Sequence, residues 1–243
     1  MSDFSQKPAS GSTEAPGPGE DHALGEAYRH LRIAIGLLAL SLPFAVVIGK
    51  GLLDHSWDLQ GSLSAYYYTR SRNYFIGALC ALAVFFLSYE YRHVNEFRAD
   101  NYLSNLASVA AVGVAFLPTT RGGVESTGAE KVVGALHYVS AVALFVTLGI
   151  FCLFLFTRSQ GGETPQKKMR NRLYRACGWV IAGCLVLCAI ALWTAPDSWR
   201  ALFWLESIMV WAFAISWLVK GEFRGILADQ PPQAAPPAAG PTA

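Results

Sequence analysis

Six long apolar runs constrain the fold of this chain more than any other feature of its sequence. A helix needs about 20 mostly apolar residues to cross a bilayer, and a spanning backbone must satisfy its own hydrogen bonds as a helix or a closed barrel. The runs are longer than the strands of a barrel. The sequence therefore predicts an all-α integral membrane bundle of six transmembrane helices. The predicted spans are residues 33–49, 73–89, 101–120, 132–157, 176–196 and 201–219.

The composition excludes other classes of protein. Of the 243 residues, 53% are hydrophobic and 15% are charged. Soluble domains carry about 25% charged residues, so these values exclude an ordinary soluble enzyme and a disordered chain. A net charge of +2 is too small to indicate nucleic-acid binding. The lipid bilayer is the expected partner, and the sequence leaves a homo-oligomer open.

Two polar tails flank the predicted membrane domain. Residues 1–27 are rich in Gly, Pro and Ser, and residues 225–243 are rich in Pro and Ala. Such compositions cannot build a packed core, so we expect two disordered tails around a six-helix domain at residues 28–224. The first 24 residues lack the apolar core of a signal peptide, so we expect the first helix to remain as an anchor.

The distribution of Lys and Arg predicts the orientation of the chain. Cytoplasmic loops carry an excess of these residues, and 13 of the 19 lie in the two termini and in the loops on the same side. We therefore expect both termini in the cytoplasm. The basic stretch at residues 164–175 begins with Thr164 and Pro165, which are typical of a helix N-cap and first position. Its charges are expected to set the topology and to contact anionic lipid, with docking of a partner as the alternative.

Small residues predict how the helices pack. Ala107, Ala111 and Ala115 recur every four residues in the third run, a spacing that lets helix backbones approach closely. We therefore expect the third helix at the centre of a compact bundle. The five cysteines all fall in predicted helices, where they are expected to pack as small apolar residues without disulfides.

Two ionisable residues are predicted at membrane depth. Glu206 lies seven residues after Trp199, and His137 lies six residues after Lys131. At about 1.5 Å per residue, both side chains lie roughly 10 Å below the outer edge. Ionisable residues inside spans are functional candidates by default, and at equal depth these two are placed to pair in the bundle interior. The alternative is that each is a hydrogen-bonded group with a structural role.

The first outer loop holds the remaining candidate ligands. His55 and Asp58 supply an imidazole and a carboxylate, which zinc accepts, although no second His completes a familiar spacing; a solvated loop is the alternative. Arg70 and Arg72, which follow Tyr68, are candidates for binding an anionic headgroup or a substrate carboxylate. The two arginines are equally suited to snorkel from the top of the second helix.

Five blocks of the sequence are distinctive as a set: SLSAYYYTRSRNYFIGALCALAVFFLSY, DNYLSNLASVAAVGVAFLPTT, GALHYVSA, TPQKKMRNRLYRACG and FWLESIMVWAFAISWLVKGE. Together they resemble an uncharacterised bacterial family of multi-pass membrane proteins, known as a domain of unknown function. The resemblance covers about residues 28–224 and implies a multi-pass fold in the bacterial inner (plasma) membrane, without an established activity.

That family is in turn distantly similar to the superfamily of alkaline ceramidases and progestin/adiponectin-type receptors. Its members have seven helices and are often zinc-dependent amide hydrolases. Their pattern is a Ser followed four residues later by His, an Asp, and a late His-x-x-x-His, and Asp100 matches the Asp. In this chain the residue four positions after Ser64 is Tyr68, and the residue four positions after His137 is Ala141, whereas the pattern has His at both places. The zinc ligand set implied by the similarity is therefore incomplete here.

Three functions are consistent with these features of the sequence. The favoured one is binding or transport of a small molecule or lipid through an outward-facing polar pocket lined by Glu206, His137, Arg70, Arg72 and Tyr68. The second is a membrane-embedded, metal-dependent hydrolase of lipid amides or esters, in which His137, Glu206 and Ser64 act and a metal or His137 activates the nucleophile. The third is a non-catalytic accessory subunit of a membrane complex, in which the basic fourth loop matters most.

Overall fold

The computed structural model describes residues 18–88, 98–121, 125–158, 164–196 and 199–221. Within these ranges the regular structure is helical and contains no strand, which confirms that the chain is all-α. A short 3-10 helix, η1, precedes α2, and a π-helical turn, η2, extends α4. The elements are α1 Pro18–Leu53, η1 Ser64–Tyr68, α2 Arg72–Ser88, α3 Arg98–Phe116, α4 Gly128–Ile150, η2 Phe151–Leu155, α5 Pro165–Thr194 and α6 Ala201–Lys220.

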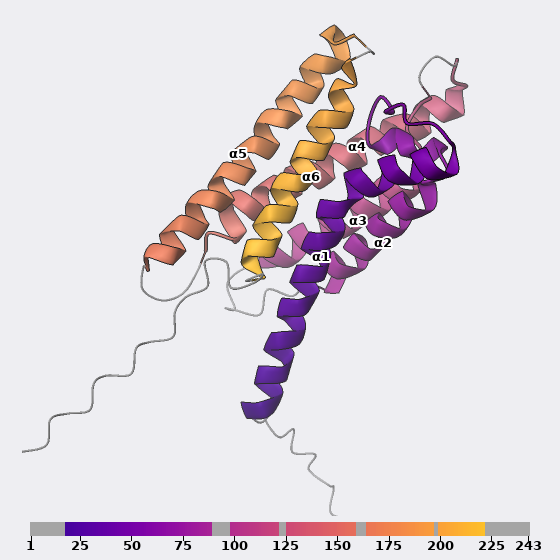
Figure 1. The fold of residues 1–243 in the computed structure, drawn as a ribbon. Helices are drawn as coiled ribbons and strands as arrows, with labels where there is room; N and C mark the ends of the chain where they lie inside the picture. Colours follow the sequence, from indigo (N-terminus) through magenta and orange to yellow (C-terminus); the bar gives the residue numbers. More distant parts are fainter. Residues whose placement is uncertain (1–17, 89–97, 122–124, 159–163, 197–198, 222–243) are drawn as a thin grey trace, which may run out of the picture.

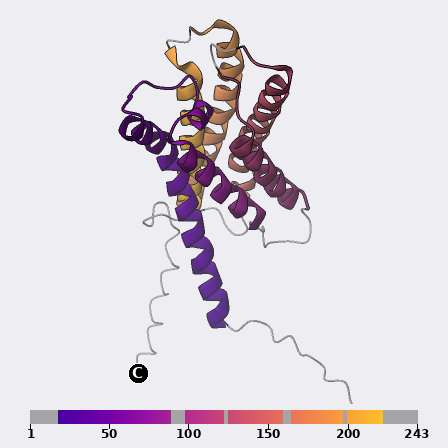
Figure 2. The ribbon, with the colours of Figure 1, turned by 90° about the vertical axis from the view of Figure 1, so that its right-hand side faces the viewer.

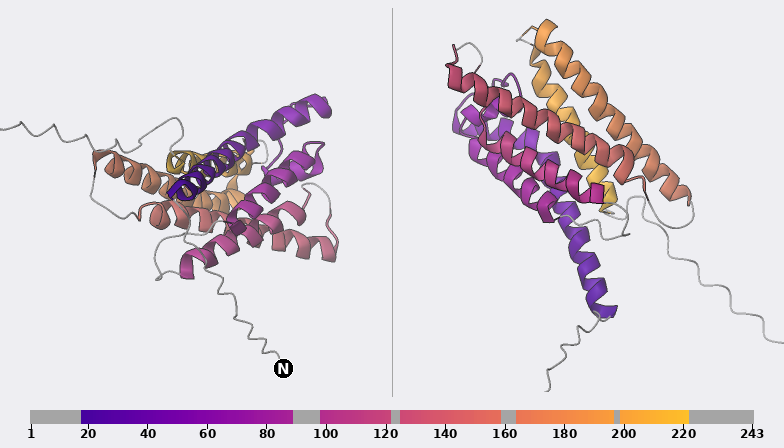
Figure 3. Two further views of the ribbon diagram at one scale, coloured as in Figure 1. Left: turned by 90° about the horizontal axis from the view of Figure 1, so that it is seen from below. Right: turned by 180° about the vertical axis from the view of Figure 1, so that it is seen from behind.

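The six α-helices form a ring in chain order. Each packs mainly against its neighbours in sequence, and α1 packs against α6 to close the ring. Successive helices alternate in direction, so the connections gather at two opposite ends (Figures 1 and 2). We call the end that carries the 54–71 segment, at the top of Figure 1, the loop end, and the opposite end the basic end. Seen from behind, α4 and α5 cover the face of the bundle opposite α1 (Figure 3).

Four helical stretches are long and apolar enough to cross a membrane: Gly25–Leu53, Gly128–Leu155, Pro165–Thr194 and Ala201–Lys220. Two shorter apolar helices, Arg72–Ser88 and Asn101–Phe116, lie among them. The composition of these stretches indicates a membrane protein. Each of the six helices contains most of one predicted apolar run, because long apolar runs favour helix regardless of finer sequence detail.

Most helices begin or end a few residues from the boundaries of the predicted spans, and the starts of α1 and α5 lie more than ten residues before them. Helix α1 begins at Pro18, within the 1–27 segment that we expected to be a tail. This start is typical of a helix N-terminus, because Pro18 is at the first position and the acidic residues Glu20 and Asp21 follow it in the first turn. The predicted tail at 225–243 lies outside the described residues. At α5, the predicted start is confirmed: the Thr164 side chain accepts from the Lys167 amide at 3.2 Å, and Pro165 is the first residue.

The prediction that the third helix is central is wrong. Ala107, Ala111 and Ala115 are fully buried as expected, but α3 packs mainly against α2 and α4 within the ring. On the α2 side, the Ser108 hydroxyl donates to the Ala83 carbonyl at 2.8 Å. Small residues therefore bring α3 close to its two neighbours, and none of the described helices occupies the centre.

Aromatic rings fill part of the centre of the ring of helices. Trp217 of α6 is completely buried, and its ring centroid lies 4.9–6.2 Å from those of five phenylalanines. We call this group the aromatic cluster. Edge-to-face and tilted pairs at these separations stabilise a core beyond the area they bury. The five partners of Trp217 are Phe85, Phe86, Phe151, Phe156 and Phe213.

Candidate functional site

Glu206 of α6 binds backbone amides of the 54–71 segment. Its Oε2 accepts from the Leu63 N–H at 2.7 Å and from the Ser64 N–H at 3.3 Å. These amides open η1, and the first amides of a helix have no partner inside that helix. The Phe203 N–H also donates to the Gly61 carbonyl at 3.2 Å. The first two turns of α6 therefore fasten the 54–71 segment across the loop end.

A cavity lies beneath this contact, inside the ring of helices. We call it the interior cavity; its free volume is about 50 Å³. Its walls come from α1, α2, α3, α4 and α6, and from Leu63 and Ser64 of the 54–71 segment. All of its lining residues are apolar except Glu206 and Ser64. The sequence led us to expect a polar pocket that opens outward, whereas the structure has a mostly apolar one partly covered by a loop.

His137 of α4 is placed differently from Glu206. Its buried side chain brings Nδ1 to 2.6 Å from the Leu117 carbonyl, just past the end of α3. The last carbonyls of a helix lack intrahelical partners, and a protonated Nδ1 donates to this one. His137 is not among the residues that line the interior cavity. The predicted pair is therefore replaced by two separate contacts, in which each side chain satisfies the backbone where a helix ends.

Tyr68 is bound to the α3–α4 connection. Its hydroxyl donates to the Thr119 carbonyl, and the guanidinium of Arg121 lies 4.4 Å from the centre of its ring. Burial raises the pKa of the Tyr68 phenol, against the opposing charge of Arg121, so the hydroxyl stays protonated and able to donate. Tyr68 thus holds η1 against a neighbouring loop.

The two predicted ligand-binding arginines also hold the 54–71 segment. Arg70 donates to the Leu53 carbonyl at 2.8 Å and pairs with the Asp54 carboxylate at 3.5 Å. Arg72 donates to the Tyr67 hydroxyl at 2.7 Å and covers its ring at 4.1 Å. Neither arginine is among the lining residues of the interior cavity. Of the five residues that we expected around one pocket, Glu206 alone lines it.

The candidate metal ligands of the first loop do not converge. His55 is exposed, in a left-handed conformation with φ of 52°. The Asp58 carboxylate accepts from the Ser56 hydroxyl at 3.1 Å. Among the residues that the structure describes, no three His, Cys, Asp or Glu side chains come together as a group that could hold a metal ion.

The zinc site implied by the superfamily resemblance does not fit this arrangement. His137 is bound to a carbonyl and Glu206 to two amides, while the side chain of Asp100 lies outside the described residues. Ser64 lines the interior cavity, but His137 does not, so the three residues that we considered for hydrolysis do not surround one cavity.

Lys50 is a residue that our sequence reasoning missed. It is the last basic residue of α1, and its side chain is only 6% exposed. Its ammonium donates to the Ser56 carbonyl at 3.1 Å, the Ser56 hydroxyl at 2.8 Å and the Asp58 carbonyl at 2.8 Å. These three bonds use all three of its donors. The position of Lys50 at the end of an apolar run, with polar residues soon after it, was the available signal that its ammonium could bind the following loop.

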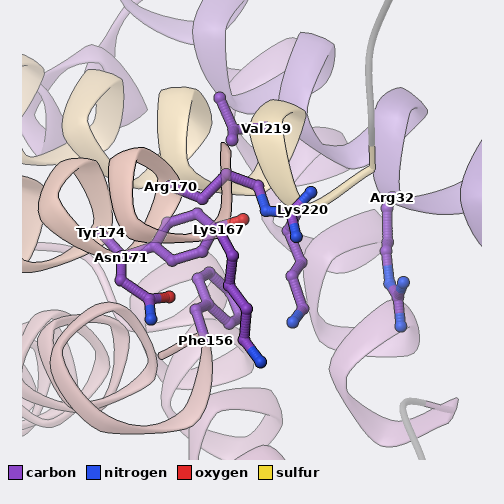
Figure 4. A pocket seen from close by; sticks show the side chains of 8 residues that line it. All are labelled: Arg32, Phe156, Lys167, Arg170, Asn171, Tyr174, Val219 and Lys220. Atoms are coloured by element: carbon purple, nitrogen blue, oxygen red, sulfur yellow. The ribbon is translucent and has the colours of Figure 1, made fainter. Parts of the chain in front are cut away.

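A second cavity, at the basic end, was also missed. It has a volume of about 170 Å³, and we call it the basic pocket. Four cations from three helices line it, each half-buried (Figure 4). Lys167, Arg170 and Lys220 lie close together near the Phe156 ring, and Arg32 is set apart on α1. The full lining is Arg32, Phe156, Lys167, Arg170, Asn171, Tyr174, Val219 and Lys220.

Comparisons of the chain with protein-family models, with curated proteins and with solved structures found no match. The family and superfamily resemblances drawn from blocks of sequence therefore stay predictions.

Proposed function

We propose that the chain is a multi-pass protein of the bacterial inner membrane with six spans and both termini in the cytoplasm, and that it binds a small apolar molecule or the apolar part of a lipid. The alternating direction of six apolar helices and the bias of Lys and Arg support this topology. Helix α2 has 17 residues and rises about 26 Å. A bilayer accommodates such a short span by thinning locally.

The observation that carries the binding proposal is the interior cavity. Unfilled space in a core costs about 24 cal/mol per Å³, so its 50 Å³ costs about 1 kcal/mol. An apolar pocket with a few convergent polar groups is the usual form of a small-molecule site. Here the polar groups are the Glu206 carboxylate and the Ser64 hydroxyl, both at the loop end.

Binding of anything larger than a few carbon atoms requires the 54–71 segment to move. Leu63 and Ser64 form part of the cavity wall, and their amides are held by Glu206. Release of these two bonds, and of the nearby bonds from the Phe203 amide to Gly61 and from Tyr68 to Thr119, would admit a ligand. The segment would act as a cover and Glu206 as its fastening.

The aromatic cluster favours binding over transport. Along α6, Phe213 and Trp217 lie between Val210, which lines the interior cavity, and Val219, which lines the basic pocket. The rings around Trp217 pack at contact distance. A path through the ring of helices would have to separate them, whereas binding leaves the cluster in place.

The test is photolabelling of the full-length protein in detergent with a long-chain fatty acid that carries a diazirine on its alkyl chain. Labelled residues are mapped by mass spectrometry. Wild type is expected to carry a saturable label on residues that line the interior cavity. Ala141→Leu replaces a methyl group in the cavity wall by an isobutyl group and should remove that label.

The matched control is Ala189→Leu, the same substitution on the exposed surface of α5. It should leave the cavity label unchanged. Equal labelling in wild type and Ala141→Leu, or label confined to the exposed faces of the helices, would overturn the proposal.

A further inference from the structure

The geometry points to the basic pocket as a binding site for a phosphate group, carried by a lipid headgroup or by a small soluble molecule. This inference concerns the opposite end of the bundle from the interior cavity. It does not depend on what the interior cavity binds.

The first argument is the convergence of charge from distant parts of the chain. Arg32 comes from α1, Lys167 and Arg170 from the start of α5, and Lys220 from the end of α6. No run of basic residues in the sequence contains this set, so the fold brings the four side chains to one cavity. Several cations from separate helices around one space attract an anion more strongly than any one of them does alone.

The second argument is selection within the basic stretch of α5. Lys167 and Arg170 are three residues apart, and Tyr174 follows four residues later, so the three share one face of the helix. That face lines the pocket. Arg172 and Arg175 of the same stretch are exposed and are not among the lining residues. A basic stretch that served only to fix topology would not need some of its cations to line a cavity while others are exposed.

The third argument is the floor of the pocket. Phe156 and Tyr174 are almost completely buried, and their ring centroids lie 5.4 Å apart. The Lys220 ammonium lies 5.9 Å from the centre of the Phe156 ring. Phe156 also packs against Trp217 at 4.9 Å. The Lys220 ammonium therefore lies over a buried aromatic surface, of which Phe156 belongs to the aromatic cluster, and the Asn171 amide also lines the pocket (Figure 4).

Size and chemistry select the ligand class. A volume of 170 Å³ is that of roughly six waters at about 30 Å³ each, which suits a tetrahedral oxyanion with a few waters. The planar fork of Arg binds two oxygens of one phosphate, and Lys adds compact charge. A phosphate monoester offers three terminal oxygens and up to two charges to the cations, whereas a carboxylate offers two oxygens and one charge. The lining side chains also make other interactions, so the ligand would share their donors.

The position of the pocket is compatible with both sources of phosphate. It lies where α6 ends and α5 begins, which is the cytoplasmic interface in the topology proposed above. Basic pockets between transmembrane helices on this side bind lipid headgroups. A soluble phosphate ester reaches the same place from the cytoplasm.

The experiment measures binding to the full-length protein in nanodiscs of phosphatidylcholine. Isothermal titration is carried out with dihexanoyl phosphatidic acid, with glycerol 3-phosphate, and with dihexanoyl phosphatidylcholine as the zwitterionic reference. We expect saturable binding of at least one of the two phosphate monoesters and none of the reference. Binding of the lipid alone identifies a headgroup site, and equal binding of both identifies a site for soluble phosphate.

Two double variants separate the pocket from general surface charge. Lys167→Gln with Arg170→Gln removes two lining cations and should weaken binding at least tenfold. Arg172→Gln with Arg175→Gln removes the same charge from the same helix outside the pocket and should change binding less than twofold. Equal weakening by both variants, or no binding by wild type, would overturn the inference.

A second pair of substitutions guards against loss of folding. If the α5 double variant has a lowered thermal midpoint, Arg32→Gln with Lys220→Gln tests the same pocket from α1 and α6, with the same tenfold expectation. Lys167→Arg with Arg170→Lys keeps the charge and should retain binding within about threefold. Failure of the charge-conserving variant to bind, while it remains folded, would also contradict a phosphate site built on these cations.

Discussion

The cations at the two ends of the bundle have different surroundings. At the loop end, Lys50 is buried and bound by three oxygens, and Arg70 is bound to a neighbouring carbonyl and carboxylate. At the basic end, four half-buried cations converge on a cavity. The first arrangement holds chain segments together, and the second places cations from three helices around one space, in addition to their interactions within the chain. In an apolar protein, the surroundings of a cation therefore indicate its role better than its position in the sequence.

The largest effect is expected from Lys50→Met. The substitution removes all three hydrogen bonds of the buried ammonium and leaves the Ser56 and Asp58 carbonyls without these bonds. Bonds to charged groups contribute about 1.5–3 kcal/mol each, and buried groups left unbonded cost about 1–3 kcal/mol. We expect a loss of roughly 3 kcal/mol in the free energy of unfolding.

This loss is measured by thermal unfolding in detergent, together with limited proteolysis of the 54–71 segment. Lys131→Met, at an exposed site on α4, is the control and should stay within about 0.5 kcal/mol of wild type. Similar midpoints for the two variants would remove the contrast between the ends of the bundle.

A smaller loss is expected from Glu206→Gln. The amide oxygen still accepts from one backbone N–H, but the charge-assisted character of the bonds to Leu63 and Ser64 is lost. We expect about 1–2 kcal/mol of destabilisation and faster hydrogen exchange at these two amides. Glu26→Gln, at an exposed position on α1, is the reference. Unchanged exchange at Leu63 and Ser64 would show that Glu206 does not fasten the segment.

The smallest effect is expected from Lys220→Gln at the basic end. Partly solvated ion contacts contribute about 0–1 kcal/mol, and removal of one of four clustered cations reduces their mutual repulsion. The thermal midpoint should therefore change less than in Glu206→Gln. A drop as large as that of Lys50→Met would mean that this end, too, uses its charge for structure.

The sequence predicted the helices well and the sites poorly. Apolar runs located all six helices, because burial of an apolar segment in lipid depends on the segment alone. The depth estimate for Glu206 and His137 led us to a pair, yet their partners are the Leu63 and Ser64 amides and the Leu117 carbonyl. A sequence does not show which unpaired backbone groups at helix ends a side chain will meet, because that depends on how the neighbouring loops fold.

The basic pocket could not be predicted from the sequence either, because it depends on which helices pack together. Lys167 and Arg170 stood out as part of a basic stretch, but nothing in the sequence joined them to Arg32 and Lys220. The ring order of the helices, which places α1, α5 and α6 side by side, is a property of packing over the whole chain. The expectation of a central third helix failed for the same reason.

Helix α6 is continuous and contributes Glu206 to the interior cavity and Lys220 to the basic pocket. Glu206 and Lys220 are 14 residues apart, which is about 21 Å along the axis and within about 40° of the same side. The helix contains neither Pro nor Gly, whereas α1 contains Pro43 and α4 passes into a π-helical turn. A stiff rod transmits tilt from one end to the other. Occupancy of the basic pocket and release of the 54–71 segment would then be thermodynamically linked, with each ligand changing the affinity for the other by the same factor.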